Sequence, residues 1–100
     1  MTKTLKVEMY ADERDFIVDL IEYALLDDLI NKLKQAKPTK ENIINIRLDG
    51  YDLEQLIGNL SLEANHNKKR SVQELACEMA EKLELYEFQL KRMKETTNEK

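Results

Sequence analysis

The stretch from Ser71 to Met93 constrains the fold of this chain more than any other. Apolar residues recur there at three- and four-residue steps, which at about 100° per residue puts them on one helix face within an arc of roughly 120°. This stripe consists of Val72, Leu75, Ala76, Met79, Leu83, Tyr86, Leu90 and Met93. The segment Ser71-Val72-Gln73-Glu74 has the form of a capping box and predicts that the helix begins there. A helix of this length with one continuous apolar stripe needs a long partner.

The preceding segment predicts that partner. A second helical stripe is formed by Leu53, Leu56, Ile57, Leu60 and Ala64. Asp49-Gly50 predicts a turn, after which Asp52 is placed to cap the helix and Tyr51 to pack against Leu56 as a hydrophobic staple. The polar segment 65–70 has the length expected of a turn between antiparallel helices. We therefore expect a C-terminal antiparallel helical hairpin.

Two short segments alternate between apolar and polar residues. The first has Leu5, Val7 and Met9, and the second has Ile44, Ile46 and Leu48. A period of two predicts strands that bury one face. Because each also shows a polar face, an antiparallel ribbon with helices on one side fits better than a parallel pair buried on both sides.

The segment 12–36 predicts a long N-terminal helix, with Asp12 as its N-cap and Pro38 just beyond its end. Its apolar stripe changes face in the middle. The first set is Phe16, Ile17, Leu20, Ile21 and Ala24, and the second, on nearly the opposite face, is Leu25, Leu26, Leu29, Ile30 and Leu33. Three explanations compete: a break near Asp27, one helix packed on both sides, or one helix whose second half packs on another subunit. Because no Gly or Pro marks a break, the sequence favours a continuous or slightly bent helix packed on both sides.

Together these elements predict a helix-rich α+β fold in the order β-α-β-α-α. It consists of two short strands, a long N-terminal helix and a C-terminal antiparallel helical hairpin. One hundred residues suffice for one modest core, so we expect a single domain over 1–94 and a frayed polar tail over 95–100.

Composition excludes several classes of function. A net charge of −4 gives no global attraction to phosphate or anionic lipid. The N-terminal segment lacks the apolar core of a signal peptide, and four acidic residues interrupt the longest apolar stretch, 16–33, so no membrane association is expected. With Cys77 as the single cysteine, no intrachain disulfide can form, which favours the cytoplasm. Abundant Lys, Asn, Ile and Glu suit a bacterial or phage genome rich in A and T.

Candidate catalytic and metal-binding residues are few. His66 is the only histidine and lies eleven residues from Cys77 on a different predicted helix, whereas a metal site needs several converging ligands. Lys82 is the only basic residue near Cys77 whose positive charge would lower the pKa of the thiol. We therefore expect no enzyme activity, no metal and no cofactor.

Apolar residues outside the main stripes indicate a contact with a protein partner. Cys77, Leu85 and Phe88 lie on the rear of the last helix, where a solvated face is expected. They pack either on the N-terminal helix of the same chain or on another subunit. The second half of the N-terminal helix, with Leu25, Leu29 and Leu33, packs either on a second layer of the same chain or on another subunit. We expect a small non-enzymatic protein that binds protein partners or regulates them, and that forms a homo-oligomer.

An alternative is DNA binding, although nucleic acid is the less expected partner. A strand at 43–48 followed by two helices is also the order of ribbon–helix–helix proteins, whose paired strands enter the major groove. Asn45 and Arg47 would then face the bases, and the basic cluster of Lys68, Lys69 and Arg70 would contact phosphate. The acidic net charge, the long helices and the additional strand at 5–9 depart from that class.

Overall fold

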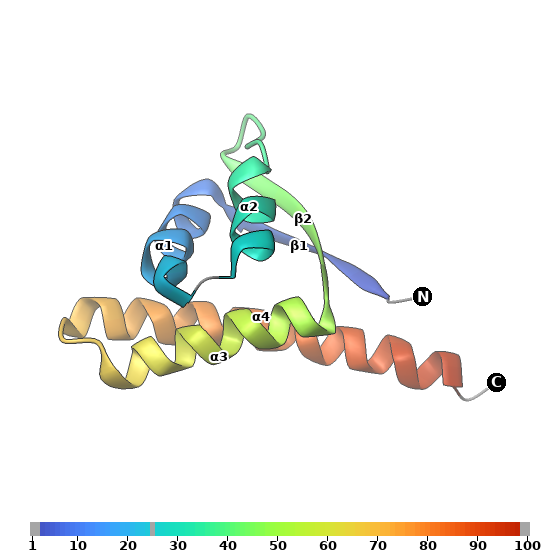
Figure 1. The fold of residues 1–100 in the computed structure, drawn as a ribbon. Coiled ribbons are helices and arrows are strands. Elements are labelled where there is room, and N and C mark those ends of the chain that lie inside the picture. The colour runs from blue at the N-terminus through green and yellow to red at the C-terminus, as the bar shows by residue number, and fades with distance from the viewer. Residues whose placement is uncertain (1–2, 25, 99–100) are drawn as a thin grey trace.

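The computed structural model describes residues 3–24 and 26–98, and the side chains of residues 3–24 and 26–92. The elements are β1 (Thr4–Tyr10), α1 (Ala11–Ile21), a 3-10 turn (Glu22–Ala24), α2 (Asp27–Gln35), β2 (Ile43–Asp49), α3 (Gly50–His66) and α4 (Arg70–Asn98). Figure 1 shows α3 and α4 side by side as a lower layer, with the two strands, α1 and α2 above them. The predicted helix-rich α+β class is confirmed.

The two strands form an antiparallel ribbon. Their register runs from Thr4 opposite Asp49 to Tyr10 opposite Ile43. The inward residues of the alternation are buried against the helices, as the period of two predicts: Val7, Met9, Ile44, Ile46 and Leu48. The outward residues Lys6, Glu8, Asn45 and Arg47 are exposed.

Both edges of this ribbon meet side chains from other elements. On the β1 edge, the backbone N–H of Glu8 donates to the hydroxyl of Tyr86 at 3.3 Å, and that hydroxyl lies 3.4 Å from the Glu8 carbonyl oxygen. On the β2 edge, the ammonium of Lys32 donates to the carbonyl oxygen of Arg47 at 3.5 Å. A two-stranded sheet is marginal alone and open edges invite foreign strands, so packing on helices stabilises the ribbon and covers its edges.

The segment predicted as one helix over 12–36 is two helices, so the preferred interpretation of a continuous helix is wrong. Helix α1 ends at Ile21, and Leu26 leaves the helical conformation (φ −89°, ψ 61°) before α2 begins at Asp27. A straight helix would put its two apolar sets on opposite faces. The change of direction lets both sets reach the same core, where Ile17, Ile21, Leu29, Ile30 and Leu33 are buried and Val18 joins them. Asp27 and Asp28 also suit the first turn of a new helix, where the dipole favours negative charge.

Arg14 joins the two short helices. Its Nη1 donates to the carbonyl oxygens of Leu33 and Ala36, both at 2.9 Å, and its Nε donates to Asp15 at 2.7 Å. The last carbonyl groups of a helix have no intrahelical partner, and a cation is favourable there because of the helix dipole. An α1 side chain thus caps the C-terminus of α2.

Helices α1, α3 and α4 all begin two or three residues earlier than predicted. Helix α3 begins at Gly50, because the Asp49 carboxylate accepts the backbone N–H of Asp52 at 2.8 Å, and the Asp52 carboxylate lies 3.4 Å from the Asp49 nitrogen. Asp49 is therefore the N-cap, and Asp52, the third residue of the helix, completes the capping box. Tyr51 is exposed and lies inside α3 instead of before its cap, so it does not hold the position that the predicted staple requires.

The other two starts follow the same logic. Helix α1 begins at Ala11, before the predicted cap Asp12, since the carboxylate of Glu13 accepts the backbone N–H of Tyr10 at 2.9 Å. Helix α4 begins at Arg70, because Asn67 Oδ1 accepts the backbone N–H of Lys69 at 2.9 Å and shapes the turn before it. In both cases a polar side chain satisfies a backbone N–H group that lies before the predicted cap, so the helix begins earlier.

The hairpin of α3 and α4 forms one layer of the core, below the strands and the two short helices. Its fully or nearly buried residues are Leu53, Leu56, Leu60, Ala76, Met79, Ala80, Leu83 and Leu90. The predicted hairpin is confirmed, while Met93 lies outside the described side chains. The predicted tail (95–100) begins inside α4, which extends to Asn98. In the described part of the chain, no helix has the length and apolarity needed to cross a membrane.

Candidate functional site

The described side chains do not assemble a metal centre. No group of three or more His, Cys, Asp or Glu among them could hold a metal ion. His66 is exposed in the last turn of α3, and Cys77 is exposed on α4.

Neighbouring carboxylates raise the pKa of the Cys77 thiol. Its thiol lies 3.6 Å from the Glu81 carboxylate, one helical turn away. The negative charge of Glu81 is the largest cause that raises the pKa of the Cys77 thiol, and Glu78 and Glu84 act in the same direction. Because the thiolate is the nucleophile, this surrounding disfavours nucleophilic use of the cysteine.

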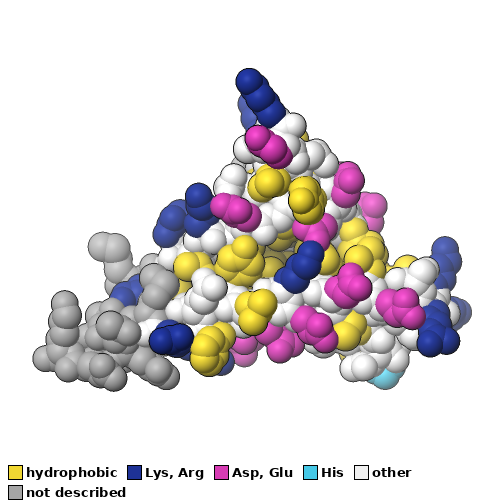
Figure 2. Space-filling view, turned by 180° about the vertical axis from the view of Figure 1, so that it is seen from behind, with side chains coloured by type: hydrophobic (Ala, Val, Ile, Leu, Met, Phe, Trp, Pro, Cys, Tyr) yellow, Lys and Arg dark blue, Asp and Glu magenta, His cyan; other side chains and the backbone are white. Residues whose placement is uncertain are grey.

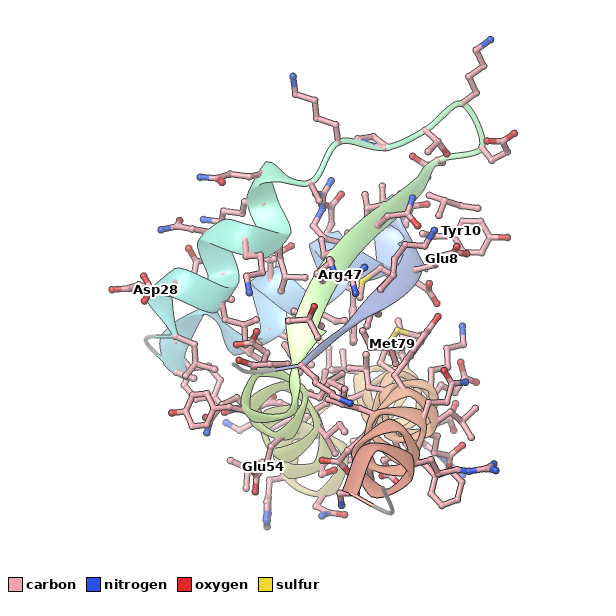
Figure 3. All side chains as sticks on the ribbon, turned by 90° about the vertical axis from the view of Figure 1, so that its right-hand side faces the viewer. Glu8, Tyr10, Asp28, Arg47, Glu54 and Met79 are labelled. Atoms are coloured by element: carbon pink, nitrogen blue, oxygen red, sulfur yellow. The ribbon has the colours of Figure 1, made fainter. Side chains whose placement is uncertain are left out.

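A groove of about 450 Å³ lies where β1 and α1 face α4. We call it the β1–α4 groove. Met9, Ile17, Met79 and Leu83 are among the apolar residues that line it, and Leu85 stands at its margin on α4. Figure 3 shows Met79 between the ribbon and the hairpin, with Glu8 and Tyr10 on the outer side of the ribbon. Methionines fill irregular space and adapt to different neighbours, so this lining is suited to apolar contact.

An ion pair spans the groove between α1 and α4. Lys82 Nζ lies 2.7 Å from the Glu13 carboxylate, which also accepts the backbone N–H of Tyr10. The hydrogen bond to Glu13 is the main cause that raises the pKa of Lys82. The site is thus an apolar groove crossed by a paired charge, and it presents no free acid and base side by side.

The rear of α4 presents an exposed apolar pair. Leu85 is 66% exposed and Phe88 is 61% exposed. The guanidinium of Arg92 lies over the Phe88 ring, 5.9 Å from its centroid. Glu81 shares this face, because steps of four, three and four residues keep all four side chains within an arc of roughly 60°. We call Glu81, Leu85, Phe88 and Arg92 the outer patch of α4. In Figure 2, which shows the α4 side, hydrophobic side chains are bordered by acidic and basic ones.

The candidate partner contacts of the sequence divide into two groups. Leu29 and Leu33 are buried in the chain's own core, and Leu25 lies outside the described residues. Leu85, Phe88 and Cys77 are exposed, because α4 packs on α3 and β1 with its other face. Of the two interpretations of this rear set, packing against the N-terminal helix does not occur.

The candidate DNA contacts are not brought together. Asn45 and Arg47 lie on the outer face of the ribbon, and the Arg47 guanidinium donates to the Thr4 hydroxyl at 2.9 Å and to the Thr4 carbonyl oxygen at 3.2 Å. Lys68, Lys69 and Arg70 lie at the turn between α3 and α4. Since β2 leads directly into α3, the 17 residues of α3, about 25 Å long, separate the two sets.

Sequence reasoning missed the β1–α4 groove and the ribbon edge covered by Tyr86. Their residues come from segments as far apart as Glu8 and Tyr86, and each of these residues fits the pattern of its own element. Comparison of the chain with protein-family models, with curated proteins and with solved structures gives no significant match.

Proposed function

We propose that this chain is a small, non-enzymatic, cytoplasmic protein that binds protein partners and associates with itself through the outer patch of α4. The observation that carries the proposal is the exposure of Leu85 and Phe88 beside each other on one helix. An aromatic ring and an arginine are residue types enriched where proteins meet, and here the Arg92 guanidinium lies over the Phe88 ring.

The energetics favour a partner on this surface. Burial of apolar area contributes about 25 cal/mol per Å² of favourable free energy. A contact that buries the two large exposed side chains would therefore be stabilised. The adjoining β1–α4 groove extends the apolar surface, because Leu85 belongs to both. The non-enzymatic part of the proposal rests on the raised pKa of Cys77 and on Glu13 and Lys82 being paired with each other.

The DNA-binding alternative has less support. Arg47 already donates to Thr4, and the cations of the hairpin turn lie at the other end of α3. On the ribbon face, Glu8 lies 3.8 Å from Lys6 and lowers the local positive charge.

Sedimentation velocity tests the self-association. We expect the sedimentation coefficient of the wild type to rise with concentration from micromolar to millimolar protein. Leu85→Glu and Phe88→Glu should remove the rise, because each puts a charge into the contact. The matched control is Leu62→Glu on α3, whose leucine is 49% exposed and should tolerate the change. A wild type that stays monomeric throughout this range would end the proposal of self-association.

A further inference from the structure

We infer that the outer patch of α4 binds a second copy of itself with the two α4 helices antiparallel, about a two-fold axis that passes between Leu85 and Phe88. This inference rests on the proposed self-association and adds the orientation and register of the two copies. It follows from the order of charges along the patch.

Along α4 the patch begins with an acidic residue, continues with two apolar residues and ends with a basic residue: Glu81, Leu85, Phe88 and Arg92. In an antiparallel copy the order is reversed. Leu85 then faces the partner's Phe88, and Glu81 faces the partner's Arg92. Because the contact is two-fold symmetric, each match occurs twice.

A parallel pair in register lacks this match. It would set Glu81 against the partner's Glu81 and Arg92 against the partner's Arg92, and like charges opposite each other oppose association. In the antiparallel register the Glu81–Arg92 match occurs at both ends of the apolar pair, so opposite charges flank the apolar centre on both sides.

The side chains are arranged for such a contact in the single chain. The Arg92 guanidinium lies over the Phe88 ring, so the positive charge is held beside the apolar pair. The Glu81 carboxylate is exposed and its Cys77 contact of 3.6 Å is long, so it can accept a stronger bond from the partner's Arg92. One helix pair makes a contact smaller than the roughly 1,600 Å² of standard stable interfaces, so we expect a dissociation constant in the micromolar range.

Charge exchange tests the register. Glu81→Arg and Arg92→Glu each set like charges against each other, and each should raise the dissociation constant about tenfold or more. The double variant restores both matches with the charges exchanged, so its dissociation constant should return to within about threefold of the wild type. The control Glu54→Arg makes the same charge change on α3, on the other side of the hairpin (Figure 3), and should leave the constant unchanged. Circular dichroism verifies that each variant is folded.

A distance measurement tests the orientation independently, because Cys77 is the single cysteine and is exposed. In the antiparallel register, a spin label on Cys77 lies about 28 Å along the helix axis from the label of the partner, at 1.5 Å per residue. A parallel pair in register would bring the labels to about the interhelical distance of 8–10 Å plus the label length. Sedimentation of the labelled protein checks that the label leaves association intact.

The outcomes separate this inference from the proposed function. Rescue by the double variant together with the long label distance supports the antiparallel pair. A second outcome is that the wild type associates and Phe88→Glu disrupts the association, but the double variant stays monomeric or the labels lie close together. This outcome would contradict the antiparallel register and would still support self-association through the outer patch. A wild type monomeric at all concentrations removes both.

Discussion

Three glutamates around an exposed thiol set what Cys77 can do. With Glu81, Glu78 and Glu84 raising its pKa, the fraction present as thiolate near neutral pH is smaller than for an ordinary cysteine. The thiol of Cys77 therefore stays mostly protonated at neutral pH, although it is exposed.

The rate of alkylation of Cys77 as a function of pH should follow this raised pKa. We expect the midpoint to lie above that of an unperturbed cysteine, and Glu81→Gln to lower it, because it removes the largest cause of the shift. At mildly alkaline pH the variant should therefore react faster. The matched control Glu54→Gln should behave as the wild type. An unchanged midpoint in Glu81→Gln would show that the carboxylate does not act on the thiol.

Arg14 should contribute more to stability than other arginines of the chain. Arg14→Met removes a cation that binds Leu33 and Ala36 at the end of α2, and we expect it to lower the free energy of unfolding by about 1.5–3 kcal/mol. The control Arg70→Met removes a side chain that is 89% exposed and pairs only with Glu74 among the described contacts, and should cost less than about 0.5 kcal/mol. Urea unfolding measures both. Equal costs would contradict a capping role for Arg14.

At the scale of elements, the break between α1 and α2 decides how the N-terminal third packs. The chain leaves the helical conformation without Gly or Pro, because the break lets two apolar sets of opposite phase reach one core. Several backbone hydrogen bonds of a continuous helix are lost there, and the burial of leucine and isoleucine side chains offsets them.

The buried second half of this segment can be tested at Leu29, which is 6% exposed. Leu29→Asp strands an unpaired charge in apolar surroundings, and we expect it to lower the free energy of unfolding by several kcal/mol, about 3 or more. Leu62→Asp introduces the same change at an exposed leucine and should cost less than about 1 kcal/mol. Thermal unfolding followed by circular dichroism compares them. An unchanged melting temperature in Leu29→Asp would mean that α2 does not face the core.

Most elements could be predicted from the sequence, and the reason is local. Alternation in β1 and β2 and the stripes of α3 and α4 each depend on residues a few positions apart. The N-terminal segment was harder, because its phase change at 24–28 fits both a break and a two-sided helix until the neighbouring elements are placed. The helix starts failed for a related reason. Asp49 and Asp52 are both good caps, and the choice depends on where β2 ends.

The candidate site was predictable only in part. Cys77, Leu85 and Phe88 departed from a stripe that the sequence shows, so the exposed rear of α4 could be expected. The β1–α4 groove arises from three-dimensional packing of β1, α1 and α4, and no spacing along the chain indicates it. The same holds for the Arg14 cap, whose acceptors lie 19 and 22 residues away.

At the scale of the whole molecule, a net charge of −4 opposes approach to nucleic acid. We expect no salt-sensitive retention of the chain on duplex DNA at physiological ionic strength. Arg47→Ala and Lys68→Ala should likewise leave any residual retention unchanged, since neither residue belongs to one continuous basic surface with the other. Fluorescence anisotropy with labelled duplex at several salt concentrations measures this. A tight complex that weakens steeply with salt would instead favour the DNA-binding alternative.

The pairing of β1 with β2 has a consequence for the order in which the chain folds. Thr4 pairs with Asp49, so the chain must pass through α1 and α2 before the two strands can pair. In contrast, α3 and α4 are joined by a short turn of residues 67–69. Closing a long loop loses entropy before its contacts form, so the hairpin is expected to assemble early and the ribbon late. During synthesis β1 is made before α4, and Tyr86, whose hydroxyl bonds to the edge of β1, lies 78 residues after Glu8. This edge of β1 therefore stays unprotected until α4 is made, and the nascent chain is expected to need shielding of β1 until then.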